Sequence, residues 1–577
     1  MQDLRLIFRY GRPYHRDLIA AVALIVVECG FEMVIPTLMA TLIDEGVPAQ
    51  DLAVILRQGG LMALCAVLAL VTGLLYARFA ARYANGFAAE LRKAEYAAVE
   101  KFDFANLDHF SGASLVTRMT TDATVLLNAV NTGLRPLVRS PVMLCMGLCM
   151  AFLLSPRLTV IFLVAAPVLG LMLGWIVSRV APLYGRQQRA VDRLNGRIQE
   201  SLTGIRAIKA FVRGEWENEQ FDAVNGELCD ASTETFRHAV LNTPVFQAVM
   251  YTVILCIMWF GGTFILDGSM QVGQLTGFLS YVLQVLNSVM MFSGVFLQMT
   301  RSLASARRIR EVLTEQPDLA DAAHPVAEVP GGAIDFENVS FKYNRQAQKN
   351  ALSDITLHIP AGATVGVIGG TGSAKTTLVQ LIPRLYDATE GTVRVGGRDV
   401  RDYDLAALRD AVGIVLQKNL LFSGTIRDNL KWGKPDATDG ELWAACRAAH
   451  ADEFLRRMPD GLDTDLGQGG VNVSGGQKQR LCIARTLLKQ PKVLIFDDST
   501  SAVDTATESG IRRALAELDG VTKIIIAQRI SSVQSADMIV ILDDGRLHAV
   551  GTHDELLARD SIYQEIYYSQ MKGGGVS

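Results

Sequence analysis

The sequence predicts a chain of two fold classes, an all-α membrane domain with six long helices and then a soluble α/β domain. Half of the 577 residues are hydrophobic, only 20% are charged, and the mean hydropathy is +0.24, which is typical of a protein that lies partly in a membrane. The long apolar runs all lie before about residue 300. Beyond residue 333, short strand-like and helix-like patterns alternate.

Six apolar runs reach the ~20 residues that a helix needs to cross a bilayer. Within a membrane domain over residues 1–313, they lie near 18–42, 61–80, 135–154, 158–178, 245–266 and 275–299. The segment before the first run carries Arg5, Arg9, Arg12 and Arg16, whereas the loop after that run is acidic, which places the N-terminus in the cytoplasm. This N-terminal segment is short and amphipathic, and we expect it to lie on the cytoplasmic membrane surface.

Long polar stretches separate the second run from the third and the fourth from the fifth, while the other connections are short. We expect both stretches to project into the cytoplasm. Their bends, at 109–124 and 199–211, predict short helices that lie across something below them in a docking role, although solvated helical loops are an alternative. A linker over 314–333, rich in Pro, Ala and acids, leads to a soluble domain over 334–570.

A glycine-rich turn between a strand and a helix marks a phosphate site in ATVGVIGGTGSAKTTLVQLI (363–382). Glycines let backbone N–H groups approach phosphate oxygens, and the helix N-terminus adds a positive dipole. Lys375 would reach the β- and γ-phosphates, and Thr376 would bind magnesium. Ala374 departs from the usual glycine, and we expect its methyl group to be tolerated there because helical φ is negative.

Two further motifs follow in the same domain. VLIFD (493–497) predicts a buried strand that ends in Asp497, the carboxylate expected near magnesium. VSGGQKQR (473–480) predicts a second glycine-rich turn that opens a helix, which is again an anion-binding geometry. One nucleotide does not need two such loops from one chain, so we expect a dimer in which each loop faces the other chain's phosphates.

With these motifs in this order, the chain resembles an exporter-type ATP-binding cassette half-transporter over essentially its whole length, with a P-loop NTPase fold in the soluble domain. The resemblance implies ATP and Mg²⁺ as cofactors, with Tyr343 stacked on adenine, Gln417 sensing magnesium and the membrane domain, and Asp497 binding Mg²⁺. It implies that the bends at 109–124 and 199–211 are coupling helices. The loop residues that it implies are Gly369, Gly370, Thr371, Gly372, Ser373, Ala374, Lys375, Thr376 and Thr377 (Walker A), Ser474, Gly475, Gly476 and Gln477 (signature), and Asp504 (D-loop).

Two positions depart from the family pattern. Asp498 stands where the family has a catalytic glutamate, and Gln528 stands where it has the switch histidine. Aspartate falls short of glutamate by ~1.5 Å, about one C–C bond, and a glutamine amide hydrogen-bonds but cannot become cationic. This pairing resembles the degenerate-site subunit of a heterodimeric bacterial multidrug exporter. Alternatives are a homodimer in which Asp498 works as the base, a non-hydrolysing regulatory or sensor subunit, and an importer.

The substrate and the partner are less specified. An apolar six-helix bundle suits a hydrophobic drug, a lipid or a peptide, and the net charge of −4 gives no basic excess for nucleic acid. The resemblance implies a second half-transporter subunit as partner and the bacterial cytoplasmic (inner) membrane as location. Glu28 and Glu32 lie on one face of the first span. They either face a cavity, where they attract a cationic substrate or bind a proton, or they form hydrogen bonds between helices or mark a place where water reaches the bundle.

Overall fold

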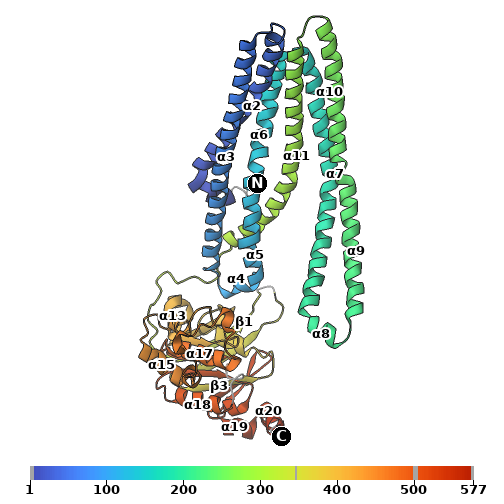
Figure 1. Cartoon of the computed structure of the whole chain (residues 1–577). Coiled ribbons are helices and arrows are strands. Elements are labelled where there is room, and N and C mark those ends of the chain that lie inside the picture. Colours follow the sequence, from blue (N-terminus) through green and yellow to red (C-terminus); the bar gives the residue numbers. More distant parts are fainter. Residues whose placement is uncertain (1–5, 345–346, 498–504, 574–577) are drawn as a thin grey trace. The chain divides into compact units, whose positions relative to one another are not determined.

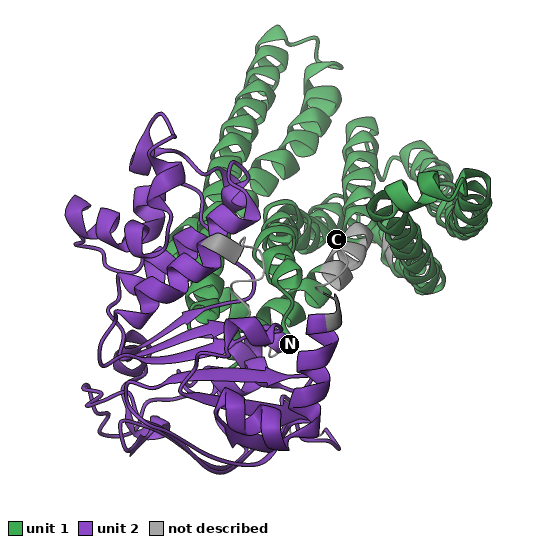
Figure 2. Cartoon of the chain, turned by 90° about the horizontal axis from the view of Figure 1, so that it is seen from below, with its two compact units in different colours: residues 1–101, 110–315 green, residues 102–109, 316–577 purple. Residues whose placement is uncertain are grey.

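The computed structural model describes residues 6–344, 347–497 and 505–573. The chain divides into two compact units (Figure 2). Unit 1 consists of residues 1–101 and 110–315, and unit 2 consists of residues 102–109 and 316–577. The short segment 102–109 therefore belongs with the soluble domain, although the sequence runs through it between two membrane helices.

The secondary structure of unit 1, over its described residues from 6 onward, consists of helices alone (Figure 1). Its helices include six that are long and apolar enough to cross a membrane, which confirms the predicted all-α domain with six spans. The helical elements of unit 1 are η1 (Arg9–Tyr14), α2 (His15–Thr41), η2 (Leu42–Gly46), α3 (Leu52–Val99), α5 (Gly112–Thr117), η3 (Arg118–Asp122), α6 (Ala123–Leu154), α7 (Pro156–Thr203), α8 (Ile205–Ala210), α9 (Gly214–Ala239), α10 (Asn242–Leu266) and α11 (Val272–Thr314).

Short polar residues fix the tight connections at the end of the bundle where α6 meets α7. Ser155 alone separates these two helices, and its hydroxyl accepts a hydrogen bond from the Leu158 N–H at 3.4 Å while Pro156 occupies the first helical turn. Asp51 caps α3 in the same way through the Ala53 N–H at 2.8 Å. Such caps satisfy amides that a helix start leaves open, so they set where each span begins.

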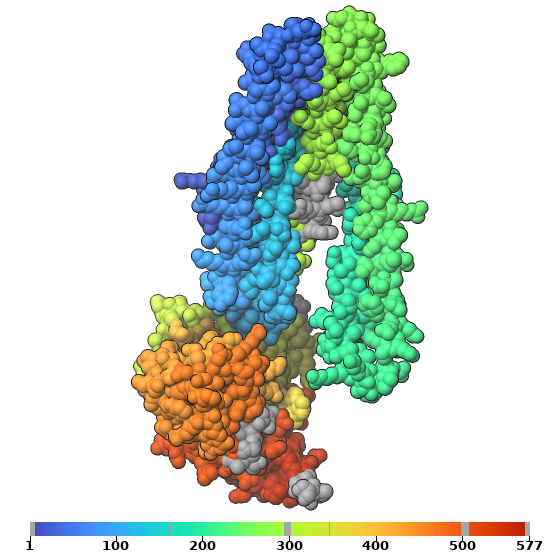
Figure 3. Space-filling model, viewed as in Figure 1, coloured from blue at the N-terminus to red at the C-terminus, as the bar shows by residue number. Residues whose placement is uncertain are grey.

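The helices α3, α6, α7 and α11 extend well beyond the apolar runs. In the space-filling view, the limb built from α7, α8, α9 and α10 stands apart from α3 and α6 over much of its length (Figure 3). Ion pairs join α7 to α9 in this limb, with Arg193 to Glu227 at 2.8 Å and Arg197 to Glu217 at 2.6 Å. The short helix expected within 199–211 is α8.

The bend of the first polar stretch lies earlier than the sequence suggests. The short helix α4 (Phe104–His109) reaches only the first residue of the expected range 109–124, and its segment is the one that belongs to unit 2. Residues 112–122 instead continue as α5 and η3 into α6. Polar helical sequence gives no clear signal for the reversal point, because both arms share the same period.

The part of unit 2 that the structure describes contains two sheets. The smaller, in the order β2-β1-β4-β5, is antiparallel, and the larger has the order β10-β9-β3-β8-β7-β6 with β9, β3, β8, β7 and β6 parallel. The strands are β1 (Ile334–Phe341), β2 (Leu352–Ile359), β3 (Thr364–Gly369), β4 (Glu390–Val395), β5 (Arg398–Asp399), β6 (Val412–Val415), β7 (Val493–Asp497), β8 (Thr522–Ile526), β9 (Met538–Asp543) and β10 (Arg546–Gly551).

Helices pack against strands β3, β6 and β7 of the parallel sheet, as its nearly continuous apolar strands require. Every residue of β7 is buried, which matches the predicted buried strand at 493–497. The α-helices of unit 2 that follow α4 are α12 (Lys375–Gln380), α13 (Leu405–Ala411), α14 (Ile426–Lys431), α15 (Asp439–Ala448), α16 (Asp452–Leu455), α17 (Gly475–Leu487), α18 (Thr505–Ala516), α19 (His553–Arg559) and α20 (Ser561–Gly573).

Candidate nucleotide-binding site

Four neighbouring parallel strands, β3, β8, β7 and β6, bring the predicted site residues to one edge of the sheet. The Walker A loop follows β3, Gln528 follows β8 by two residues, Asp497 ends β7, and Gln417 follows β6 by two residues. The register pairs Asp497 with Ile526 and Val415 with Phe496, so these ends are level. The carboxyl edge of a parallel sheet is where α/β proteins bind ligands.

The Walker A loop has the backbone geometry of a phosphate cradle. Gly369 has φ of 154°, and a Cβ there would lie 2.1 Å from the Leu542 carbonyl oxygen, so only glycine fits. The Lys375 ammonium group donates to the carbonyl oxygens of Gly370 at 2.7 Å and of Gly369 at 3.0 Å. The loop therefore folds around the lysine side chain.

Thr376 and Asp497 lie side by side at the head of the loop. The Thr376 hydroxyl donates a hydrogen bond to the Asp497 carboxylate at 2.9 Å, and Asp497 is buried. A hydroxyl and a carboxylate oxygen are the hard donors that Mg²⁺ prefers. Gln417 is exposed and lies two residues beyond the end of β6, the strand next to the one that ends in Asp497.

Ala374 corrects the sequence-based expectation. Its backbone has φ of 67° and ψ of 27°, so it is left-handed and not helical. The helix begins one residue later, at Lys375, because the last loop residue must turn the chain into the helix. A left-handed conformation costs a residue with a Cβ roughly 1–2 kcal/mol, so the methyl group is held under backbone strain.

Replacing Ala374 by glycine is therefore expected to stabilise the protein. The relief of strain exceeds the entropy that glycine adds to the unfolded chain, and the free energy of unfolding should rise by about 0.5–1 kcal/mol. Denaturant unfolding of the full-length protein measures this change. Ala406→Gly, on the exposed side of helix α13, is the matched control and should lower stability; equal losses in both variants would refute the strain.

Tyr343 and the Walker A loop line one cavity of about 440 Å³, together with Lys349, Asp544 and Gly545. Tyr343 is half exposed, and its hydroxyl lies 2.9 Å from the Thr377 hydroxyl. Burial raises the pKa of Tyr343, so the phenol stays protonated at physiological pH. The predicted adenine-stacking residue and the predicted phosphate loop thus share one cavity, with none of the signature residues Ser474–Gln477 among its lining residues.

The segment 102–109 is connected to Tyr343 through a second aromatic residue, Tyr386. Tyr386 packs edge-on against Tyr343, with 5.3 Å between ring centroids, and its hydroxyl donates to the Asp108 carboxylate at 2.7 Å. Burial, and then this hydrogen bond to Asp108, raise the pKa of Tyr386, so it remains a donor. Phe104 contacts the same ring at 6.0 Å between centroids.

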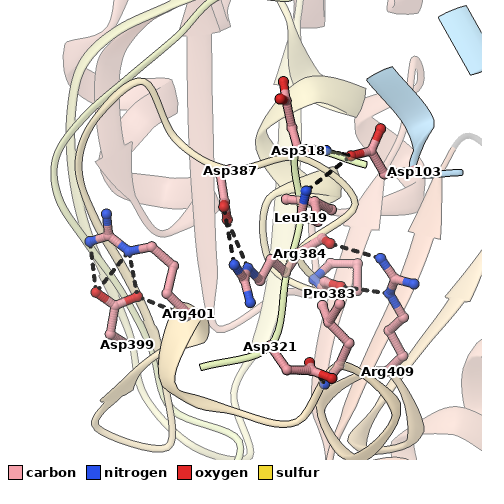
Figure 4. A network of polar contacts seen from close by, with 11 residues as sticks. Asp103, Asp318, Leu319, Asp321, Pro383, Arg384, Asp387, Asp399, Arg401 and Arg409 are labelled. Atoms are coloured by element: carbon pink, nitrogen blue, oxygen red, sulfur yellow. Dashed lines mark hydrogen bonds and ion pairs between the residues drawn. The ribbon is translucent and has the colours of Figure 1, made fainter. Parts of the chain in front are cut away.

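A second set of contacts holds the start of that segment. The buried Asp103 carboxylate accepts from the backbone N–H groups of Asp318 at 2.7 Å and Leu319 at 3.1 Å (Figure 4). Below it, Arg409 donates to the carbonyl oxygens of Arg384 and Pro383, and Arg384 pairs with Asp387 at 2.8 Å. The start of the segment is therefore held by the main chain of 318–319.

The signature loop is well formed at the start of α17. Ser474 is the N-cap residue, its backbone N–H donates to the Gln477 side chain at 2.9 Å, and its hydroxyl accepts from the Gln477 N–H at 3.4 Å. This reciprocal capping box fixes the turn. Gly475 is exposed, and a Cβ there would meet nothing within 4 Å. The loop thus presents an open backbone surface of the kind that a second nucleotide-binding domain could approach.

Gln528 is exposed in the loop after β8, and the C-terminal helix α20 forms hydrogen bonds to this loop. The Gln570 amide donates to the Gln528 carbonyl oxygen at 2.8 Å and accepts from the Ile530 N–H at 2.9 Å. Sequence reasoning missed Gln570, because nothing in the pattern of α20 connects it to β8. Asp498 and Asp504 lie outside the described residues.

Glu28 and Glu32 form an ion-pair cluster inside unit 1. Arg135 reaches Glu28 at 2.5 Å, and Arg139 reaches both Glu28 at 3.2 Å and Glu32 at 2.5 Å. Glu28 is 3% exposed. Of the two interpretations that the sequence left open, this favours hydrogen bonding between helices. Sequence reasoning missed the two arginines as partners, although they lie one helical turn apart in the third apolar run.

The comparisons with known proteins agree with this organisation. A family model described as "ABC transporter transmembrane region" matches residues 18–289, and one described as "ABC transporter" matches residues 352–501. The uncharacterized ABC transporter ATP-binding protein YfiB of Bacillus subtilis (strain 168) is 36% identical over 561 residues, which cover 97% of each chain. The uncharacterized ABC transporter ATP-binding protein Rv1273c of Mycobacterium tuberculosis (strain ATCC 25618 / H37Rv) is 37% identical over 580 residues, which cover 98% of each chain. A solved structure of a bacterial Atm1-family ABC exporter with ATP bound has a TM-score of 0.82 at 25% identity, over 96% of this chain and 99% of that one.

The chain therefore belongs to the ABC transporter family, with the transmembrane and ATP-binding domains of an exporter half-transporter. It is an integral membrane protein that binds ATP and couples ATP hydrolysis to export, and exporters of this kind act as dimers.

Proposed function

We propose that this chain is one of two unequal subunits of a heterodimeric exporter. The site built on its own Walker motifs would bind ATP and hydrolyse it slowly, while its signature loop completes the faster site of the partner. The observation that carries the proposal is Gln528, which follows β8 at the carboxyl edge of the sheet where the family has a histidine. Asp498, in place of the family glutamate, supports it from the sequence.

The residues around the Walker A loop fit Mg-ATP. Thr376 and Asp497 offer adjacent oxygen donors for Mg²⁺, and Gln417 lies on the neighbouring strand end. Bound magnesium would neutralise charge on the β- and γ-phosphates. Lys375 and the loop amides would hold the phosphates, and Tyr343 would stack on adenine. These groups would bind and orient ATP without Asp498 or Gln528, the two positions that depart from the family pattern. The site could therefore bind ATP and still hydrolyse it slowly.

Water activation is the step that the two departures weaken. Asp498 would place its carboxylate ~1.5 Å short of the glutamate position, and a displacement of about 1 Å can cost roughly a hundredfold in rate. Gln528 can hydrogen-bond the γ-phosphate but carries no positive charge. ATP would then act mainly as a bridge that closes the two domains, and hydrolysis at the partner-completed site would reset them.

The bundle is suited to an apolar or amphiphilic cargo such as a drug, a lipid or a peptide, and we place the transporter in the bacterial cytoplasmic membrane with its nucleotide-binding domain in the cytoplasm. The second candidate function is a homodimeric exporter, which the retained carboxylate of Asp498 favours. A regulatory subunit without turnover would instead bind ATP and show no substrate-stimulated hydrolysis in any complex.

The deciding experiment is Mg-ATP turnover by the purified chain in lipid, with Lys375→Ala as the background. We expect turnover no higher than that of the mutant, ATP still bound, and full activity only with a partner that supplies the glutamate and the histidine. Turnover clearly above background that falls on Asp498→Asn would overturn the unequal pair and establish a homodimer.

A further inference from the structure

We propose that the N-terminal segment and the helices beside it form a binding site for one anionic phospholipid, with an acyl chain in a cavity and the headgroup at Arg12. This site lies in unit 1 and does not depend on whether the exporter is a homodimer or an unequal pair. It concerns a lipid bound to the protein, in the leaflet that meets the N-terminal end of α2.

The cavity has a volume of about 380 Å³ and lies between η1, α2, α3, α6 and α11. Its wall is almost wholly apolar, and the charged or titratable side chains among its lining residues are Arg12, His15 and Tyr83. Arg12 and His15 lie next to each other at the junction of η1 and α2, and both are exposed. The site thus has an apolar interior with a cationic residue at one end.

A stripe along α6 lines the long wall of the cavity. Its residues recur at the helical period of three and four and are Leu126, Ala129, Val130, Gly133, Leu134 and Leu137. From Leu126 to Leu137 the stripe extends eleven residues, which is ~16 Å at about 1.5 Å per residue. A narrow apolar channel of this length suits a single acyl chain.

Gly133 marks the open middle of the stripe. It is buried within the fold, yet a Cβ built on it would meet nothing within 4 Å. Elsewhere in the same helix, a Cβ on Gly147 would lie 2.3 Å from the Val285 side chain, as expected of a well-packed interface. The space at Gly133 is therefore a real gap in the packing, and an apolar gap is a favourable place for an apolar ligand.

Close packing fixes the segment that closes the cavity. A Cβ on Gly11 would lie 2.7 Å from the Tyr83 hydroxyl oxygen, so η1 approaches α3 as closely as a glycine permits. Phe8 stacks on Phe87 with 5.8 Å between ring centroids. Phe8 is also 45% exposed, so this aromatic pair lines the edge of the cavity without closing it. The segment is held in place while the cavity keeps an edge that a chain can pass.

The charge around this edge selects an anionic headgroup. Arg9, Arg12 and Arg16 are all exposed, and the nearby acid Asp17 lies 3.7 Å from Arg82. Basic residues beside a membrane attract anionic lipids by about 1 kcal/mol each. A zwitterionic lipid offers the same chain without that gain, and a peptide would need polar partners that the cavity wall lacks.

The test is native mass spectrometry of the full-length protein after delipidation, titrated with phosphatidylglycerol or with phosphatidylcholine of the same chains. We expect one saturable phosphatidylglycerol per chain and weaker phosphatidylcholine binding. Gly133→Leu fills the cavity, and losing the burial of about two methylenes weakens binding roughly tenfold. Arg12→Gln should reduce the preference for phosphatidylglycerol by about fivefold.

Two matched variants control for general effects. Gly170→Leu adds the same side chain at an exposed helical position with open space, and Arg57→Gln removes an exposed arginine near the start of α3; neither should change lipid binding. Equal binding of both lipids to the wild type, or unchanged phosphatidylglycerol binding by Gly133→Leu, would overturn the site. If Gly133→Leu instead weakens the association of two protein subunits and leaves the number of bound lipids unchanged, the cavity holds part of a second subunit and the lipid proposal is wrong. Should Gly133→Leu not fold, the lipid site is refuted if Arg12→Gln keeps the wild-type preference for phosphatidylglycerol over phosphatidylcholine.

Discussion

Replacing Asp498 by glutamate together with Gln528 by histidine is expected to raise Mg-ATP turnover at the chain's own Walker site by about a hundredfold. Glutamate adds the ~1.5 Å that returns its carboxylate to the attacking water. Histidine adds a ring nitrogen that can carry positive charge toward the γ-phosphate. Steady-state ATPase of the purified chain in lipid, compared with the unmodified chain, measures the gain.

The single variants separate the two contributions, and we expect each to give only part of the increase because both groups act on one water. Adding Lys375→Ala to the double variant should remove the gain, which ties it to this Walker site. Unchanged ATP affinity across the series would show that binding is already complete. A double variant no faster than the wild type would mean that neither position limits the rate, and the unequal-pair proposal would lose its chemical basis.

Replacing Arg139 by leucine is expected to lower the free energy of unfolding by about 3 kcal/mol. Arg139 bridges Glu28 and Glu32, and Glu28 is almost fully buried between helices. Leucine leaves Glu32 without this partner and Glu28 with Arg135 alone, and an uncompensated carboxylate within a span is costly. Thermal unfolding of the protein in lipid nanodiscs, followed by tryptophan fluorescence, measures the loss.

A rescue variant distinguishes charge from packing. Removing both members of the Arg139–Glu32 pair, with Glu32→Gln and Arg139→Leu together, should recover much of the stability, since Glu28 keeps Arg135 and no carboxylate of the cluster is then left unpaired. Arg78→Leu, an exposed arginine of α3, is the matched control and should change little. If Arg139→Leu matches the wild type in stability, the cluster is not what holds α2 against α6.

Most of the architecture follows from sequence patterns with a strong physical cause. Twenty-residue apolar runs predict the six spans because a bilayer tolerates little else, and the structure has six such helices. The Walker A loop, the strand ending at Asp497 and the helix after Ser474 are equally local, since glycine-rich turns and capping residues specify them over a few positions. Their convergence follows from the strand order, which brings β3, β8, β7 and β6 together.

What the sequence did not supply depends on residues far apart in the chain. The left-handed φ of Ala374 is imposed by the surrounding loop and is not a preference of alanine. Arg135 and Arg139 have sequence separations of more than a hundred residues from Glu28 and Glu32, so their pairing is invisible to a local pattern. The assignment of 102–109 to the soluble unit depends on Tyr386 and on the backbone of 318–319 in the same way.

The contact of Tyr343 with Tyr386, and of Tyr386 with Asp108, has a thermodynamic corollary. If nucleotide at Tyr343 favours one position of the 102–109 segment, then any second ligand whose affinity depends on that position is coupled to the nucleotide, and each must change the affinity of the other by the same factor. A typical coupling free energy of about 1–3 kcal/mol corresponds to roughly 5–150-fold. A cargo that shifts this segment would then change ATP affinity, and ATP would change the affinity for that cargo by the same factor, through two aromatic rings and one carboxylate.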